Sequence, residues 1–247
     1  MKYAIQWLRS AFYEIHVYLM MAVIGIAFFP WALVSPKGAR VACMTYARYA
    51  IWSLGWMTGV KAEVRGTPPT DEVLIAAKHQ SFLDILMIFA AVPSGKFIMK
   101  RELMFVPFIG VYGYRIGCVP VNRGKRGQAI RKMVSDVAKG LTAPGQLIIY
   151  SQGTRTAPGV KMPYKVGSAV LYDQLGQDCV PVATNAGLFW SRRGIYKKPG
   201  TAVVEFLPRI ESGMGKNEFL SELEVRVETA SDNLMREAGF DVDNHNA

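Results

Sequence analysis

The chain has 247 residues, of which 51% are hydrophobic and only 19% are charged. This length suits one sizeable domain, or one domain with a small appendage. The composition excludes an intrinsically disordered chain. Three cysteines without a CxxC pair argue against a disulfide framework or a cysteine-rich zinc site, and they favour a reducing compartment.

The formal net charge of +10 is unevenly distributed. After residue 210 the chain has nine acidic and three basic side chains, so the excess of positive charge belongs to the first 210 residues. A basic body favours polyanionic partners: anionic lipid headgroups, phosphorylated substrates, an acidic carrier protein or nucleic acid. Composition alone does not choose among them.

The N-terminal residues have the pattern of a membrane-associated helical hairpin. Residues 17–36 contain no charged side chain, and a helix of that length covers roughly 30 Å, the thickness of a hydrocarbon core. A second apolar segment runs to about Val60 and mixes aromatic residues with Arg40 and Arg48, as helices at a membrane interface do. With a turn at residues 36–38, we expect a hairpin over residues 1–58. It either spans the membrane or enters one leaflet and returns, and the alternative is a buried hairpin of a soluble domain.

The rest of the chain alternates between predicted strands and helices. Short apolar runs predict strands at residues 73–77, 96–99, 117–121, 147–150, 179–183 and 201–207. Helices are predicted at residues 81–91, 127–141 and 165–175, and a last amphipathic helix has Leu220, Leu223, Val227, Ala230 and Leu234 on one face. This alternation predicts an α/β domain over residues 59–247, with a central mixed sheet covered by helices.

His79 and Asp84 form a candidate catalytic pair. The predicted strand at 73–77 ends just before His79, and Ser81 suits the N-cap of the next helix. On one continuous helix, positions 79 and 84 would be about 140° apart. With His79 in the loop and Asp84 in the first turn, however, the carboxylate can reach back and orient the imidazole as a general base. Spacing alone equally allows a capping aspartate beside an incidental loop histidine.

Three further blocks follow along the chain. Residues 117–123 read Gly-Cys-Val-Pro-Val-Asn-Arg, residues 150–155 read Tyr-Ser-Gln-Gly-Thr-Arg, and residues 180–183 read Val-Pro-Val-Ala. Together with His79 and Asp84, these blocks resemble the motifs of the 1-acylglycerol-3-phosphate acyltransferase family, N-H-x-x-x-x-D, a strand ending in arginine, F-P-E-G-T-R and V-P-V-A. Each block alone is a weak signal, but the ordered set is a strong one.

The resemblance implies the glycerolipid acyltransferase fold and a reaction without a metal or cofactor. A fatty acyl group would pass from a thioester donor, acyl-carrier protein or acyl-CoA, to the free hydroxyl of a lysolipid. By the family's motifs, His79 is the general base, Asp84 orients it, and Arg123 and Arg155 bind the acceptor's phosphate, for which guanidinium groups are suited. The same site would include Gln152, Gly153 and Thr154, with Lys100 and Arg101 after another strand extending the anion site.

Three positions depart from the family pattern: Lys78 stands in place of Asn, Ser151 in place of Pro, and Gln152 in place of Glu. The expected acceptor is lysophosphatidic acid, giving phosphatidic acid. Because Gln152 brings no negative charge, a lyso-aminolipid of the ornithine- or glutamine-lipid type is the alternative acceptor. A different-class alternative is a non-catalytic basic protein that binds a membrane surface or nucleic acid. It leaves His79 and Asp84 unexplained, and no nucleic-acid-binding motif is apparent.

These patterns together predict a membrane-anchored acyltransferase. Its expected partners are membrane lipids, a lysolipid acceptor and an acyl carrier, with no nucleic acid. Because acyl donors are intracellular, we expect the catalytic domain on the cytoplasmic face of a bacterial-type inner membrane. Lys37, Arg40 and Arg48, which follow the first apolar segment, agree weakly with this orientation.

Overall fold

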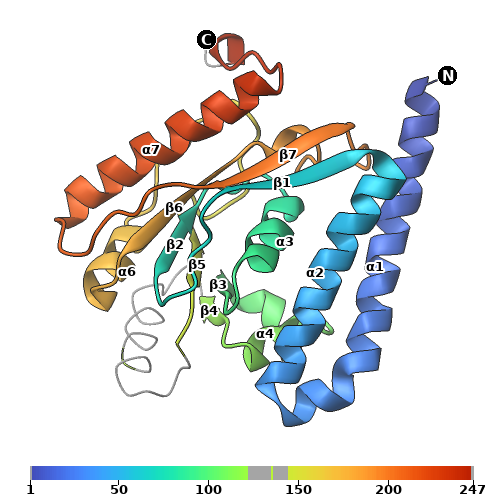
Figure 1. The fold of residues 1–247 in the computed structure, drawn as a ribbon, viewed down its shortest axis with the longest axis horizontal. Helices are drawn as coiled ribbons and strands as arrows, with labels where there is room; N and C mark the ends of the chain where they lie inside the picture. Colours follow the sequence, from blue (N-terminus) through green and yellow to red (C-terminus); the bar gives the residue numbers. More distant parts are fainter. Residues whose placement is uncertain (1, 122–134, 136–143, 246–247) are drawn as a thin grey trace.

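The computed structural model describes residues 2–121, 135 and 144–245. A seven-stranded sheet with the strand order β1-β7-β6-β2-β5-β3-β4 forms the centre. Helices cover both faces of this sheet (Figure 1), and all strand pairs are parallel except β6 with β7. The predicted α/β fold with a central mixed sheet is therefore confirmed.

The seven strands include the six that the sequence predicts, with ends shifted by at most two residues. Their bounds are β1 Val60–Gly66, β2 Leu74–Ala77, β3 Lys96–Lys100, β4 Val119–Val121, β5 Leu147–Tyr150, β6 Cys179–Thr184 and β7 Gly200–Phe206. The unpredicted strand, β1, lies at the edge of the sheet. Because only Val60 of this strand is buried, it lacks the apolar run that marks the other strands.

The helices surround this sheet on two sides. Their bounds are α1 Lys2–Val34, α2 Pro36–Thr58, α3 Phe82–Ala91, α4 Ile109–Arg115, α6 Gly167–Leu175 and α7 Lys216–Glu237, with short 3₁₀ turns η1 Arg101–Phe105, η2 Ala186–Leu188 and η3 Asp243–His245. Helix α4 was not predicted. The predicted helix at 127–141 lies almost wholly outside the described residues.

Strand β2 separates two hydrophobic cores. Ile75 and Ala77 face the core that contains residues of α1, α2 and α3, whereas Leu74 and Ala76 face the core formed with α6 and α7. Both faces of this strand are covered, which explains its continuous apolar sequence. The next residues of the chain, which include His79, emerge at the carboxyl end of this central strand.

The N-terminal hairpin turns at a single residue, Ser35, rather than over residues 36–38 as predicted. The Ser35 hydroxyl accepts the backbone N–H of Lys37 and caps α2. Pro36 can begin α2 because the first residues of a helix need no N–H donor for the helix ladder. Helix α1 is also longer than the uncharged segment and begins at Lys2.

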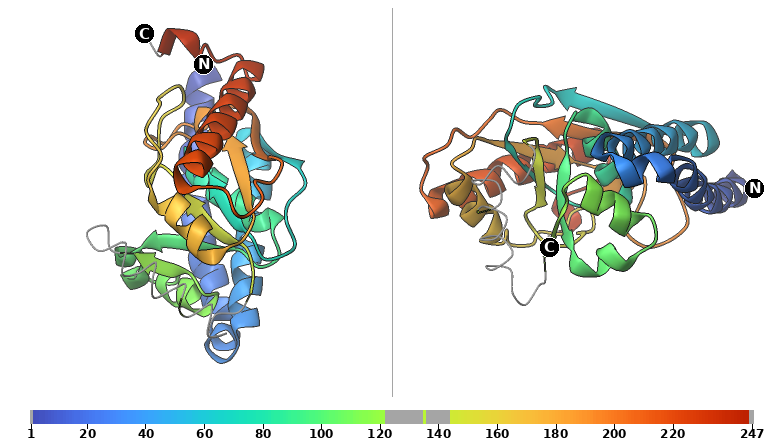
Figure 2. Two further views of the ribbon diagram at one scale, coloured as in Figure 1. Left: turned by 90° about the vertical axis from the view of Figure 1, so that its left-hand side faces the viewer. Right: turned by 90° about the horizontal axis from the view of Figure 1, so that it is seen from below.

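The α/β domain contacts α1 near both ends of this helix. Near the N-terminus, the Gln6 side-chain amide donates to the Lys197 carbonyl at 2.8 Å, and the Lys197 ammonium is 2.5 Å from the Glu14 carboxylate. Near the C-terminus, the Arg115 guanidinium of α4 donates to the Ala32 carbonyl at 2.8 Å. Helix α1 therefore lies along the domain for most of its length, as Figure 2 also shows.

The outer face of α1 is an exposed apolar stripe. Among the described residues, α1 is the one helix long and apolar enough to cross a membrane, with a mean hydropathy of 2.2 in its most apolar segment. Its exposed apolar residues recur at helical spacing along the whole helix and include Ile5, Leu8, Phe12, Ile15, Leu19, Val23, Ile26 and Leu33. A stripe of this kind is typical of helices that lie in a membrane interface.

Candidate active site

The sheet topology gathers the predicted site residues at one edge. Strands β2, β5, β3 and β4 are adjacent and parallel, so their carboxyl ends meet where α/β proteins bind ligands. His79 follows β2, and residues 151–155 follow β5. Lys100 and Arg101 lie at the end of β3 and are exposed. Arg123, expected after β4, lies outside the described residues.

His79 and Asp84 contact each other through their side chains. Nδ1 of His79 is 2.9 Å from Oδ1 of Asp84, and the aspartate is completely buried. The other carboxylate oxygen, Oδ2, accepts the backbone N–H groups of Gln80 and Ser81 at 2.8 and 2.7 Å. Asp84 is therefore both the acidic half of a capping box with Ser81 and the partner of His79, so the two readings that the spacing allowed coexist in one side chain.

Tyr150 fixes the plane of the His79 ring. The two rings stack with centroids 3.9 Å apart and planes inclined by 18°. Burial, reinforced by the negative charge of Asp84, raises the pKa of Tyr150 well above its ordinary value, so the phenol stays protonated at neutral pH. In the sequence, Tyr150 gives no signal of this contact, because it is the last apolar position of a predicted buried strand.

The loop after β5 is bonded directly to the histidine loop. The backbone N–H of Thr156 donates to the His79 carbonyl at 2.8 Å. Gly153 has a φ of 70°, a left-handed conformation that glycine adopts without strain, and Thr154 beside it is half-buried. This glycine lets the chain turn sharply between the end of β5 and Thr156.

Arg155 carries a positive charge near both Tyr150 and α1. Its side chain is half-buried, and its positive charge opposes the rise in pKa that burial causes at both Tyr150 and Tyr18 of α1. The Arg192 guanidinium donates to the Arg155 backbone carbonyl at 3.0 Å. A guanidinium at this place can bind an anionic group that reaches the site from the side of α1.

Gln152 has a different environment from the other predicted site residues. Its side chain is 1% exposed, and its amide nitrogen donates to the Met162 carbonyl at 3.3 Å and to Glu228 of α7 at 3.4 Å. The side chain is thus held by α7 on the opposite side of the histidine loop from Asp84.

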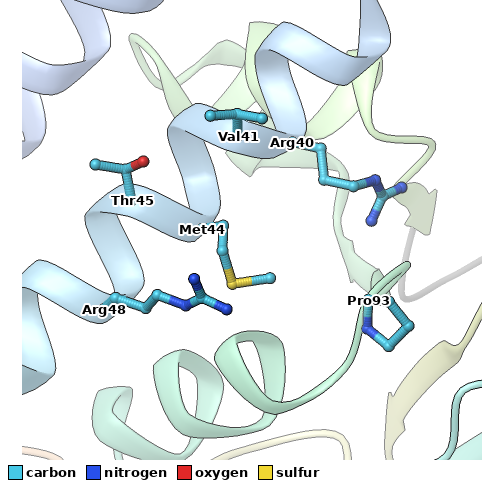
Figure 3. Close-up of a pocket in the computed structure, with 6 residues that line it drawn as sticks. All are labelled: Arg40, Val41, Met44, Thr45, Arg48 and Pro93. Atoms are coloured by element: carbon cyan, nitrogen blue, oxygen red, sulfur yellow. The ribbon is translucent and has the colours of Figure 1, made fainter.

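A separate groove of about 300 Å³ lies beside α2, near the end of α3 that is remote from His79 (Figure 3). It is lined by Arg40, Val41, Met44, Thr45, Arg48 and Pro93. The Arg40 guanidinium donates to the carbonyls of Gly95 and Ile116 at 3.3 and 3.4 Å. This arginine therefore connects α2 to the α/β domain, and the residues that line the groove do not include any of the predicted site residues.

Comparisons with known proteins agree with this arrangement. The family described as Acyltransferase matches residues 61–185. The 1-acyl-sn-glycerol-3-phosphate acyltransferase of Pseudomonas aeruginosa is 27% identical over 80% of this chain and 78% of its own length. The alpha form from Mus musculus is 27% identical over 83% and 72%.

The fold is also similar to a solved structure. The crystal structure of the 1-acyl-sn-glycerophosphate acyltransferase from Thermotoga maritima has a TM-score of 0.78 at 17% identity and covers 95% of this chain and 99% of its own. The family match covers half of this chain, and the curated relatives extend beyond it at both ends. The chain therefore belongs to the 1-acylglycerol-3-phosphate acyltransferase family and is an O-acyltransferase of phospholipid biosynthesis.

Proposed function

We propose that the protein transfers a fatty acyl group from acyl-carrier protein or acyl-CoA to the free hydroxyl of 1-acylglycerol-3-phosphate, giving phosphatidic acid. The observation that carries this proposal is the 2.9 Å contact of His79 with the buried Asp84, at a strand edge shared with Arg155. The names of the relatives from Pseudomonas aeruginosa and Mus musculus support this choice of acceptor.

The chemistry follows from the tautomer that Asp84 selects. A carboxylate at Nδ1 holds the proton on that nitrogen, so Nε2 has a free lone pair. Nε2 removes the proton from the acceptor hydroxyl as its oxygen attacks the thioester carbonyl. The tetrahedral intermediate then expels the thiolate, and the imidazolium returns its proton to that sulfur. The ester forms, the thioester breaks, and no proton is gained or lost overall.

The acceptor is tested by competition. Wild-type enzyme and Arg155→Ala each receive an acyl donor with an equimolar mixture of lysophosphatidic acid and lyso-aminolipids, and the products are quantified by mass spectrometry. We expect phosphatidic acid to dominate with wild type. Loss of the Arg155 guanidinium, which can bind phosphate in a fork, should raise KM for lysophosphatidic acid by about 10–100-fold. A dominant aminolipid product would overturn the proposed acceptor and keep the reaction class.

We also infer that the hairpin lies along one leaflet, on the cytoplasmic face of an inner membrane. The α/β domain contacts α1 near both ends, so a spanning α1 would carry a charged domain into the hydrocarbon core, at a large cost in free energy. The exposed stripe along α1 supports the flat orientation, in which Arg155 is close to a lipid acceptor in the leaflet.

Depth measurements distinguish the two orientations. A fluorophore is attached at Leu8→Cys or Ile26→Cys, both on the exposed stripe, in a background without the native cysteines. The positions are about 27 Å apart along the helix. If the helix lies flat, lipids brominated at one shallow depth should quench the fluorescence of both labels equally. A label at Glu218→Cys on exposed α7 is the unquenched control, and clearly different depths for the two stripe positions would contradict the flat orientation.

A further inference from the structure

Three polar side chains converge on the carboxylate of Glu228, in the middle of α7. The Lys78 ammonium is 2.5 Å from Oε2. The Tyr164 hydroxyl and the Gln152 amide donate to Oε1 at 3.0 and 3.4 Å. Lys78 and Gln152 are each 1% exposed and Tyr164 is 6% exposed, whereas the Glu228 side chain is 13% exposed. Glu228 therefore organises a largely buried polar cluster.

The cluster depends on the charge of Glu228. A buried ammonium without a partner is strongly unfavourable, and removal of one member of a buried ion pair leaves the other uncompensated. Residues 78–81 contain no carboxylate, and the loop after β5 has Gln152 where the family pattern has glutamate. Helix α7, from a distant part of the chain, supplies it instead.

Two routes connect this cluster to His79. Lys78 precedes His79 in the chain, so the ion pair with Glu228 anchors the backbone immediately before the histidine. The second route runs through Gln152 to Thr156, whose hydroxyl lies 3.1 Å from Oε1 of Gln152 and 3.2 Å from the His79 carbonyl. Glu228 is therefore linked to the backbone just before His79, through Lys78, and to the His79 carbonyl, through Gln152 and Thr156.

The side chains of the histidine loop alternate between two sides. Lys78 and Gln80 contact Glu228 and Met235, which lie two turns apart on the same face of α7. The intervening His79 contacts Asp84 and Tyr150 instead. Such alternation is typical of an extended segment. It allows α7 to contact the side chains of Lys78 and Gln80 while the imidazole faces the other way.

We propose that Glu228 is a positioning residue for catalysis. It acts through Lys78 and through Gln152 with Thr156, and it keeps the His79 imidazole in the position from which Nε2 can accept the proton of the acceptor hydroxyl. The inference rests on the proposed function of His79 as the general base. It adds a requirement for α7, whose residues lie outside the region that the family match covers.

The first test is a double-mutant cycle between Glu228→Gln and His79→Ala. In the wild-type background, Glu228→Gln should lower kcat by about 10–100-fold with KM nearly unchanged, as a small misplacement of a reacting group does. In the His79→Ala background the same substitution should have no further effect, because the group it positions is gone. Glu218→Gln, at an exposed position of the same helix, is the matched control and should resemble wild type in both backgrounds.

The second test moves the carboxylate. Gln152→Glu alone places two carboxylates beside one lysine and removes the amide donor, so it should also lower kcat. The exchange variant Gln152→Glu/Glu228→Gln keeps one carboxylate, one amide and one ammonium in the cluster, and it should recover kcat by about tenfold over Gln152→Glu. This comparison remains decisive if Glu228→Gln alone does not fold.

The outcomes separate this inference from the proposed function. Equal losses from Glu228→Gln in both backgrounds, an effect on KM alone, or an exchange variant no more active than Gln152→Glu would overturn the positioning role. A His79→Ala variant with wild-type kcat would instead overturn the general base. Because each comparison is relative to wild type on the acceptor that the competition assay identifies, the identity of the headgroup does not affect it.

Discussion

Replacement of Asp84 by asparagine is expected to lower kcat by about 10²–10⁴-fold, close to the effect of losing the general base itself, because it reverses the tautomer of His79. Gln80 and Ser81 both donate to Oδ2 of Asp84. An asparagine at this position keeps its single oxygen toward these two donors and turns its –NH₂ group toward Nδ1 of His79. That amide donor drives the proton to Nε2, which then has no lone pair to accept the proton of the acceptor hydroxyl.

Measurement of kcat together with the thermal midpoint Tm distinguishes this effect from a loss of fold. Asp84→Asn keeps the hydrogen bonds that cap α3, so its Tm should be close to wild type. Asp84→Ala leaves two buried N–H groups without an acceptor and should lower Tm as well as kcat. An Asp84→Asn variant that retains more than about a tenth of wild-type kcat would contradict the tautomer argument.

Replacement of His79 by alanine is the second large effect, an expected loss of about 10²–10⁴-fold in kcat from removal of the general base. The backbone of the loop is held by Thr156 and by the carbonyl of Val182, which accepts the N–H of Lys78 at 3.0 Å. These bonds do not involve the imidazole, so the fold should survive. Loss of the ring also removes the stacking partner of Tyr150, and a small decrease in Tm is expected.

A histidine in the hairpin provides the matched control. His16 is bonded to the Tyr49 hydroxyl at 2.8 Å, between α1 and α2. His16→Ala removes the same side chain and should keep most of kcat. Phosphatidic acid formation by His79→Ala at the rate of His16→Ala would remove His79 from the mechanism.

The departures from the family pattern become intelligible only in the folded chain. In the sequence, Lys78 and Gln152 are separate departures from the family pattern, and Gln152 only leaves a lyso-aminolipid open as an alternative acceptor. In the structure both side chains contact the carboxylate of Glu228, and Gln152 is buried against α7. The third motif lacks the negative charge of the family's glutamate, and Glu228 of α7, which belongs to none of the motifs, supplies a negative charge at the same place.

The sequence by itself determined the fold class and six of the seven strands among the described residues. Buried parallel strands are continuous apolar runs, so they can be recognised from the sequence alone. The contact between His79 and Asp84 was likewise predictable, because a loop followed by a helix N-cap brings residues five apart within reach. Edge strand β1 and the seven-residue helix α4 were not predicted. The strand lacks a continuous apolar run, and the helix is too short to show a helical repeat of apolar residues.

Only the tertiary structure decided which distant side chains meet. Tyr150 stacks on His79 because β5 lies beside β2 in the sheet, and Glu228 reaches Lys78 because α7 packs under β6 and the histidine loop. The same holds for the hairpin: its hydropathy allows a spanning helix, whereas contacts of the α/β domain near both ends of α1 favour a flat one. Local patterns report how a segment buries its own surface, but a buried charge is stabilised by whichever partner the packing of the whole chain brings to it.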